Sequence, residues 1–383
     1  MFFSQEEYVA RWAKVQAAMQ DRGYENLIVW QRSAGTYDRV GDVYWLTNFK
    51  ANGTGQDPAS EEYCAPFTFA AVLFRKGREP ELHFGMPDDE LALAVDPSTV
   101  VCGKLVTHEK GLMRGLSEYL AREGIEGRVA VVGDDVLPGM YDRILRRHTL
   151  QIQWVSDETF LYEPQSVKSP RELEAFRTAG EIITKALTSA MEAMIGGKTA
   201  ARAAAGAAEI IIGAGGGFHR IDINHGPASE RLILSNDLYG YSAKAAAPGD
   251  FIRIWIYGPI FEGYWLDPGR TAICGNQPTA AQKALIDATV EIVDRIVDAA
   301  VPGRTLQEVG VIGAEVAKKI CAADHELGSH LFGHGLSTNF SGQTIPVGDQ
   351  PPSWDLPTTD LPIAPGMVLA SEAFLTHPGI GLA

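Results

Sequence analysis

The sequence predicts a mixed α/β protein with two domains. Short apolar runs typical of strands alternate with amphipathic stretches through the first half of the chain, which is the pattern of an α/β domain. A turn-rich segment at residues 162–168 precedes a second strong helix start, so the domain boundary is expected there. The length of 383 residues fits two cores at roughly 150 residues per domain. We therefore expect domains at residues 1–161 and 165–383.

Composition excludes several classes of protein and partner. The chain is 45% hydrophobic and 21% charged, as in ordinary globular proteins, and its net charge of −15 disfavours nucleic acid and anionic membranes as partners. The four cysteines form no CxxC pair, which favours reduced thiols over a disulfide framework or a zinc knuckle. No secretory signal or long apolar run is visible. We expect a cytoplasmic protein.

The first half begins with a helix signal. Ser4 and Glu7 form a capping-box pattern, and apolar residues then recur at helical spacing as far as Met19. Strands are predicted at residues 27–30, 43–46, 128–132 and 151–155, a hairpin at 69–74 and 81–84, and a helix at 112–122.

The second half begins at Ser169-Pro170-Arg171-Glu172, which combines an N-cap serine, proline at the first helical position and glutamate at the third. A Gly/Ala-rich stretch follows, with a helix at 201–212; it lacks the spacing of a phosphate-binding loop. Paired strands are predicted at 251–257 and 263–266, and helices from Thr279 to about residue 301 and over 306–322. A strand-like run at residues 366–372 is the last element that the sequence predicts.

Four of these patterns occur in one order along residues 165–383. They are Lys168-Ser169-Pro170-Arg171-Glu172, the strand pair ending in Asp267-Pro268-Gly269-Arg270-Thr271, Phe332-Gly333-His334-Gly335-Leu336, and Pro365-Gly366-Met367 leading to Ser371-Glu372. This order resembles the creatinase, aminopeptidase P and prolidase superfamily, whose catalytic domain has the pita-bread fold. The first half resembles the smaller creatinase-type domain that precedes it. The resemblance also implies a homodimer.

In metal-dependent members of that superfamily, two Asp, one His and two Glu hold a pair of divalent ions. The resemblance places Asp267, His334 and Glu372 at three of these positions, and it places Trp255 where the first Asp would stand. The twelve-residue step from Trp255 to Asp267 resembles that of the dimethylsulfoniopropionate lyases of the same fold, and this resemblance places Trp255 and Tyr257 at positions that are aspartates in those enzymes. An indole cannot coordinate a cation, so the metal centre is expected to be degenerate.

Other family positions differ as well. The last family glutamate would lie beyond Glu372, so either the sequence ends at Ala383 before that residue or the site lacks it. Ser341 stands where the peptidases have a second histidine, whereas His330 resembles a histidine of aminopeptidase P.

Each candidate residue also has an ordinary structural explanation. Asp267 suits a turn before Pro268, and a lone histidine such as His334 is more often structural. Glu372 lies in an apolar run, where a carboxylate needs a partner. Core or dimer packing competes with substrate binding for Tyr239 and Tyr241, and His225 suits a turn-like stretch. Trp255 and Tyr257 are expected to form an aromatic wall that favours apolar or cationic groups.

Three functions remain open. The first is a hydrolase or lyase that acts on a small polar molecule with a C–N or related bond. It would use His334 as acid/base, with Glu372 and Asp267, and no intact binuclear centre. The second is a metal-dependent Xaa-Pro dipeptidase or aminopeptidase, or an enzyme similar to the dimethylsulfoniopropionate lyases. It would hold one Mn, Fe, Co or Zn ion on Asp267, His334, Glu372 and a glutamate beyond Ala383. The third is a non-catalytic module that binds a ligand or peptide, as the peptidase-like domain of a histone chaperone does. Binding of the substrate by His330, Tyr239, Tyr241, Trp255 and Tyr257 is expected in the catalytic alternatives.

Overall fold

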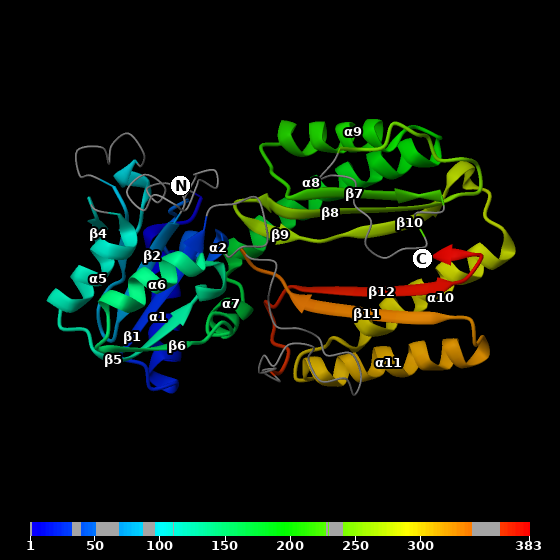
Figure 1. Ribbon diagram of the computed structural model, residues 1–383. Helices are drawn as coiled ribbons and strands as arrows, with labels where there is room; N and C mark the ends of the chain where they lie inside the picture. Colours follow the sequence, from blue (N-terminus) through cyan, green and yellow to red (C-terminus); the bar gives the residue numbers. More distant parts are fainter. Residues whose placement is uncertain are drawn as a thin grey trace. The chain divides into compact units, whose positions relative to one another are not determined.

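The computed structural model describes residues 2–32, 40–50, 69–86, 96–109, 111–226, 229, 240–338 and 361–383. The chain divides into two compact units, residues 1–165 and 166–383 (Figure 1). Both contain helices and strands, so the prediction of a mixed α/β protein is confirmed. None of the helices in these ranges is long and apolar enough to cross a membrane.

Unit 1 is built on a six-stranded sheet with the order β4-β3-β2-β1-β5-β6. Its elements are α1 (Gln5–Asp21), β1 (Asn26–Arg32), α2 (Val40–Thr47), β2 (Phe69–Arg75), β3 (Glu81–Phe84), β4 (Lys104–Thr107), α5 (Leu112–Arg122), β5 (Gly127–Val132), α6 (Gly139–His148), β6 (Ile152–Ser156) and α7 (Tyr162–Ser166). The β1–β2 and β2–β3 pairs are antiparallel, and the other neighbours are parallel. Helices α5 and α6 bury their apolar residues against β1, β2 and β5.

The strand predicted at residues 43–46 is wrong, because these residues lie in helix α2. The Arg11 guanidinium donates to the Trp45 carbonyl, and the Trp12 indole N–H donates to the Leu46 carbonyl, each at 2.8 Å. The last carbonyls of a helix lack partners within the helix, so these donors from α1 stabilise the end of α2. The turn predicted at 162–168 likewise contains a short helix, α7.

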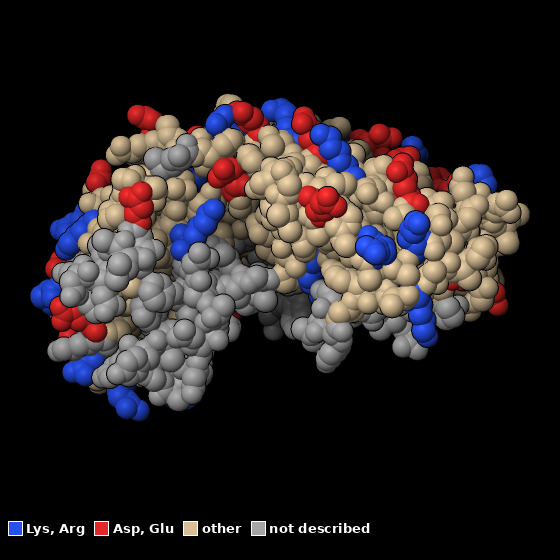
Figure 2. All heavy atoms as spheres, turned by 90° about the horizontal axis from the view of Figure 1, so that it is seen from above, with Lys and Arg blue, Asp and Glu red and all other residues tan. Residues whose placement is uncertain are grey.

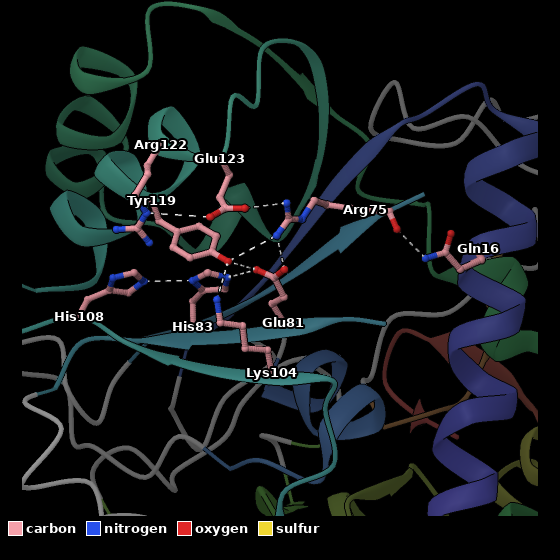
Figure 3. A network of polar contacts seen from close by, with 9 residues as sticks. All are labelled: Gln16, Arg75, Glu81, His83, Lys104, His108, Tyr119, Arg122 and Glu123. Carbon is pink, nitrogen blue, oxygen red and sulfur yellow. Dashed lines mark hydrogen bonds and ion pairs between the residues drawn. The ribbon is translucent and has the colours of Figure 1, made fainter. Parts of the chain in front are cut away.

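A buried polar network joins β2, β3, β4 and α5 in unit 1 (Figure 3). Glu81 accepts hydrogen bonds from Arg75 and from the Tyr119 hydroxyl, and its Oε2 lies 3.5 Å from His83 Nε2. His83 Nδ1 lies 3.0 Å from His108 Nε2, and the two rings are nearly parallel. The network thus holds an anionic carboxylate and two imidazoles under the helix α5.

Unit 2 contains two sheets, each covered by a pair of helices (Figure 1). One sheet has the order β10-β8-β7, with β9 paired to β8; its strands are β7 (Arg220–His225), β8 (Phe251–Phe261), β9 (Tyr264–Leu266) and β10 (Gly269–Ile273). Helices α8 (Pro170–Ile195) and α9 (Ala200–Gly213) pack on it. The second sheet contains β11 (Gly328–Gly335), β12 (Leu369–His377) and β13 (Gly381–Leu382), covered by α10 (Ala280–Ala299) and α11 (Leu306–Ala323).

The helix starts predicted in unit 2 are confirmed. Ser169 and Glu172 form a reciprocal capping box at α8, and Thr279 with Gln282 does the same at α10. The predicted strand pair was too short, because β8 continues to Phe261 and a turn at Glu262 and Gly263 connects it to β9. Both turn residues have positive φ, 48° at Glu262 and 78° at Gly263, and a positive φ explains why glycine occupies residue 263. His225 ends strand β7 instead of lying in a turn.

Acidic and basic side chains are interspersed on the face that Figure 2 shows. Ion pairs one helical turn apart occur on exposed helix surfaces of the chain, such as Lys283 with Asp287 at 2.5 Å and Arg171 with Glu174 at 2.5 Å. Such exposed pairs contribute little stability, at most about 1 kcal/mol each. The net negative charge is therefore not gathered into one patch among the described residues of this face.

Candidate functional site

Three residues that are far apart in the sequence meet in unit 2. Asp267 lies in the link between β9 and β10, His334 lies on β11, and Glu372 lies on β12. His334 Nε2 is 3.7 Å from Asp267 Oδ2 and 3.7 Å from Glu372 Oε1. The pairing of β11 with β12 explains this proximity: Glu372 lies opposite Phe332, so His334 is its diagonal neighbour on the same face. We name Asp267, His334 and Glu372 the inner triad.

The inner triad is largely buried, and burial and the mutual charges of the three groups shift their pKa values. Burial raises the pKa of Glu372 to about 7; the Asp267 charge adds to this rise and His334 opposes it. Burial also raises the pKa of Asp267, against the hydrogen bond and charge of His334. Burial would lower the pKa of His334, but Asp267, the Gly335 carbonyl and Glu372 together raise it. The three groups therefore share protons within one small space.

The inner triad has the geometry of a site for one divalent ion. One ligand atom from each of Asp267, His334 and Glu372 lies within 4.8 Å of the others. His334 Nδ1 lies 3.0 Å from the Gly335 carbonyl, and an N–H donated there directs the Nε2 lone pair toward the two carboxylates. One imidazole and two carboxylates suit Mn, Fe, Co or Zn. The residues present thus fit one ion, whereas Trp255 supplies no ligand for a second.

A cavity of about 560 Å³ opens beside the inner triad, and its lining includes Asp267, Glu372, Trp255 and Phe374. The Trp255 and Phe374 rings lie 5.0 Å apart and form one apolar wall. The Arg253 guanidinium lies 5.4 Å from the Trp255 ring centroid and is 3% exposed as a residue. The cavity therefore combines an aromatic wall with two carboxylates and one buried cation.

The indole of Trp255 depends on a glycine in the neighbouring strand. Trp255 on β8 pairs with Gly269 on β10, and a Cβ at residue 269 would overlap the indole. Only glycine leaves room for the ring there. This glycine was part of the sequence motif, but its role depends on strand register, which the sequence does not display.

An aspartate that the sequence analysis missed lies on the same sheet face. Asp222 on β7 is directly opposite Trp255, and the Tyr257 hydroxyl donates to its Oδ2 at 3.1 Å. Arg220 contacts the other oxygen at 3.3 Å. The alternation of Arg220, Asp222 and Asn224 with Ile221 and Ile223 could have indicated a strand with one polar face.

The remaining predicted residues fall in different places. Tyr257 lies on the same face as Trp255 and contacts Asp222. Tyr241 packs against the apolar core between the first sheet and helices α8 and α9. The backbone of His330 lies on β11 opposite Phe374, but its side chain is outside the described part of the structure. Tyr239 and Ser341 also lie outside the described residues.

The model of metallopeptidase family M24 matches residues 174–383, more than half of the chain. The chain belongs to this family. The superfamily resemblance inferred from the motifs is thereby confirmed.

Relatives of the M24 chain carry dipeptidase names. This chain is 28% identical over 183 residues to the Xaa-Pro dipeptidase of Pyrococcus furiosus. The match covers 44% of this chain and 47% of the relative. It is 26% identical over 215 residues to the probable dipeptidase PepE of Mycobacterium tuberculosis, covering 56% and 52%. These matches span about half the length of either relative.

Solved structures share the fold over nearly the whole chain. Prolidase from Pyrococcus furiosus has a TM-score of 0.70 at 19% identity, covering 96% of this chain and 94% of that one. The Xaa-Pro dipeptidase from Bacillus anthracis has a TM-score of 0.72 at 17% identity, covering 98% and 92%. At such low identity these likenesses establish the fold alone.

Proposed function

We propose that this M24 protein hydrolyses dipeptides, with Xaa-Pro dipeptides as the first substrate class. The observation that carries the proposal is the inner triad, in which His334 Nε2 lies 3.7 Å from both Asp267 and Glu372. The dipeptidase names of its relatives favour this function over the metal-free C–N hydrolase that the degenerate motif first indicated. Membership of the family is shown; the substrate is our proposal.

In this proposal Asp267, His334 and Glu372 hold one divalent ion. Such an ion supplies Lewis acidity, which polarises a carbonyl and makes water a stronger acid. The protein supplies orientation: the Gly335 carbonyl fixes the His334 ring, and the Trp255 and Phe374 rings exclude water from one side of the cavity. Their apolar wall suits the ring of a proline residue.

The buried Arg253 guanidinium, beside the aromatic wall, suits the carboxylate of a dipeptide. A dipeptide carries a free carboxylate, and Arg253 lines the same cavity as Asp267 and Glu372. A guanidinium binds a carboxylate through two parallel hydrogen bonds, which also fixes its orientation. We assign Arg253 to substrate binding within this proposal.

The test is hydrolysis of Ala-Pro by protein stripped with chelator and reloaded separately with Mn, Fe, Co or Zn, with Ala-Ala as a second substrate. We expect activity that requires reloading, falls by about 100-fold or more in His334→Ala, and is unchanged in His325→Ala, which alters an exposed histidine of the same unit.

Two results would contradict the proposal in different ways. Hydrolysis that survives chelation and needs no reloading would favour metal-free acid/base catalysis by His334 and Glu372. A reloaded protein that retains its ion but cleaves no dipeptide would exclude peptidase activity and favour a small-molecule substrate or a binding role.

A further inference from the structure

A second group of metal-ligating side chains lies where helix α11 ends. Asp324 caps α11, Glu326 follows it by two residues, and His377 is the last residue of β12. His377 Nε2 lies 3.3 Å from Asp324 Oδ2 and 3.3 Å from Glu326 Oε2. We name Asp324, Glu326 and His377 the outer triad.

The outer triad is separate from the inner triad. Along β12, Ala373 and Leu375 pack into the core with helices α10 and α11, whereas Glu372 and Phe374 line the cavity. Because side chains alternate along a strand, His377 lies on the helix side, opposite to Glu372. In Figure 1 the end of β12 lies at the edge where α11 runs into β11.

The His377 ring is oriented as in a metal ligand. Its Nδ1 lies 2.8 Å from the Pro378 carbonyl, and its side chain is only 14% exposed. An N–H donated from Nδ1 to that carbonyl leaves the Nε2 lone pair facing Asp324 and Glu326. Metal-ligating histidines are commonly fixed by such a bond from the second ring nitrogen.

The electrostatics of this position favour a cation of more than one charge. Two carboxylates stand at the C-terminal end of an 18-residue helix, which carries the negative end of the helix dipole. The last turn of α11 contains no basic residue. A divalent ion at this position would balance the charge of both carboxylates.

We propose that Asp324, Glu326 and His377 bind one divalent transition-metal ion. One imidazole nitrogen and two carboxylates suit zinc, cobalt or manganese, and the exposure of Asp324 and Glu326, 45% and 69%, leaves room for water at the remaining positions. The ion would connect the end of α11 to the end of β12. It would thereby stabilise unit 2 without taking part in hydrolysis.

The test counts zinc ions per chain by equilibrium dialysis and elemental analysis, in a His334→Ala background that removes the inner imidazole. We expect one zinc per chain in His334→Ala, and one in His334→Ala/His325→Ala, the matched control in the same turn. In His334→Ala/His377→Ala we expect affinity to fall about tenfold or more. Glu326→Gln should also weaken binding, and its exposed side chain makes misfolding an implausible cause.

The readout is independent of peptidase activity, so the proposed function and this inference can fail separately. Added zinc should raise the unfolding temperature of His334→Ala and not that of the His377 double variant. An unchanged zinc affinity without His377, zinc lost through His325→Ala, or no zinc bound by His334→Ala would overturn the proposal.

Discussion

The histidine pair of unit 1 makes the stability of that unit depend on pH. His108 is 7% exposed and lies 3.0 Å from His83, which lies between it and Glu81 (Figure 3). Burial, with added repulsion from His83 and Arg122, lowers the pKa of His108 to about 3. Burial lowers the pKa of His83 as well, against the attraction of Glu81.

The size of the stability change follows from the difference in proton binding between the folded and the unfolded chain. An unfolded histidine has a pKa of about 6.5, so between pH 6.5 and the folded pKa only the unfolded chain binds the proton, and stability falls as pH falls. Each pH unit in this window costs about 1.4 kcal/mol per histidine. Lowering the pH from 7.5 to 5.0 should therefore cost about 2 kcal/mol through His108 alone. This value is insensitive to the folded pKa, which lies well below pH 5.

The assay is urea unfolding at pH 7.5 and 5.0, followed by hydrogen exchange of peptides from β3 and α5 so that the signal reports unit 1. His108→Gln keeps a polar side chain that does not titrate, and it should lose about 2 kcal/mol less than the unaltered protein over this range. His148→Gln, at the exposed end of α6, is the matched control and should behave as the unaltered protein. An equal pH dependence in the unaltered protein and His108→Gln would refute a neutral, buried His108.

Three further substitutions test the packing. Gly115→Ala adds a methyl group that overlaps the His108 ring, so it should destabilise unit 1 by about 1–3 kcal/mol in urea unfolding, and an unaffected midpoint would contradict this packing. Gly269→Ala should move the Trp255 indole, shift tryptophan emission and raise KM for Ala-Pro more than it lowers kcat; unchanged emission would show that the ring does not rest on residue 269. Glu172→Ala removes the acceptor of the Tyr264 hydroxyl at 2.7 Å and of the Ser169 N–H at 2.8 Å, and should cost about 2 kcal/mol, measured against Glu174→Ala on the exposed face of α8.

The elements that sequence predicted well are those whose signals are local. Ser169 and Glu172 lie three residues apart, and the structure shows both hydrogen bonds of the capping box. The error at residues 43–46 has the opposite cause. A short apolar run fits a buried strand or a helix, and here Arg11 and Trp12, some 34 residues away, bind the carbonyls at the helix end.

In the candidate site, too, the residues with local signals could be predicted and those placed by strand pairing could not. Asp267, His334 and Glu372 could be selected from their motifs because each motif is local and their order resembles a family. Asp222 could not be selected, because its place beside Trp255 depends on how β7 pairs with β8. The outer triad was missed for the same reason: His377 is 51 residues from Glu326, and only the pairing of β11 with β12 brings them together.

Trp255, at the position where the motif resemblance would place a carboxylate, is held by its own surroundings. The indole is accommodated by Gly269 in the next strand and packs against Phe374 from the second sheet, with Arg253 over its ring. A carboxylate at residue 255 would leave this apolar space unfilled and add a charge near Asp222 and Asp267. The surrounding residues are therefore arranged for an aromatic ring. Within the proposed function, the same indole that offers no ligand to a second ion supplies the wall against which the substrate packs.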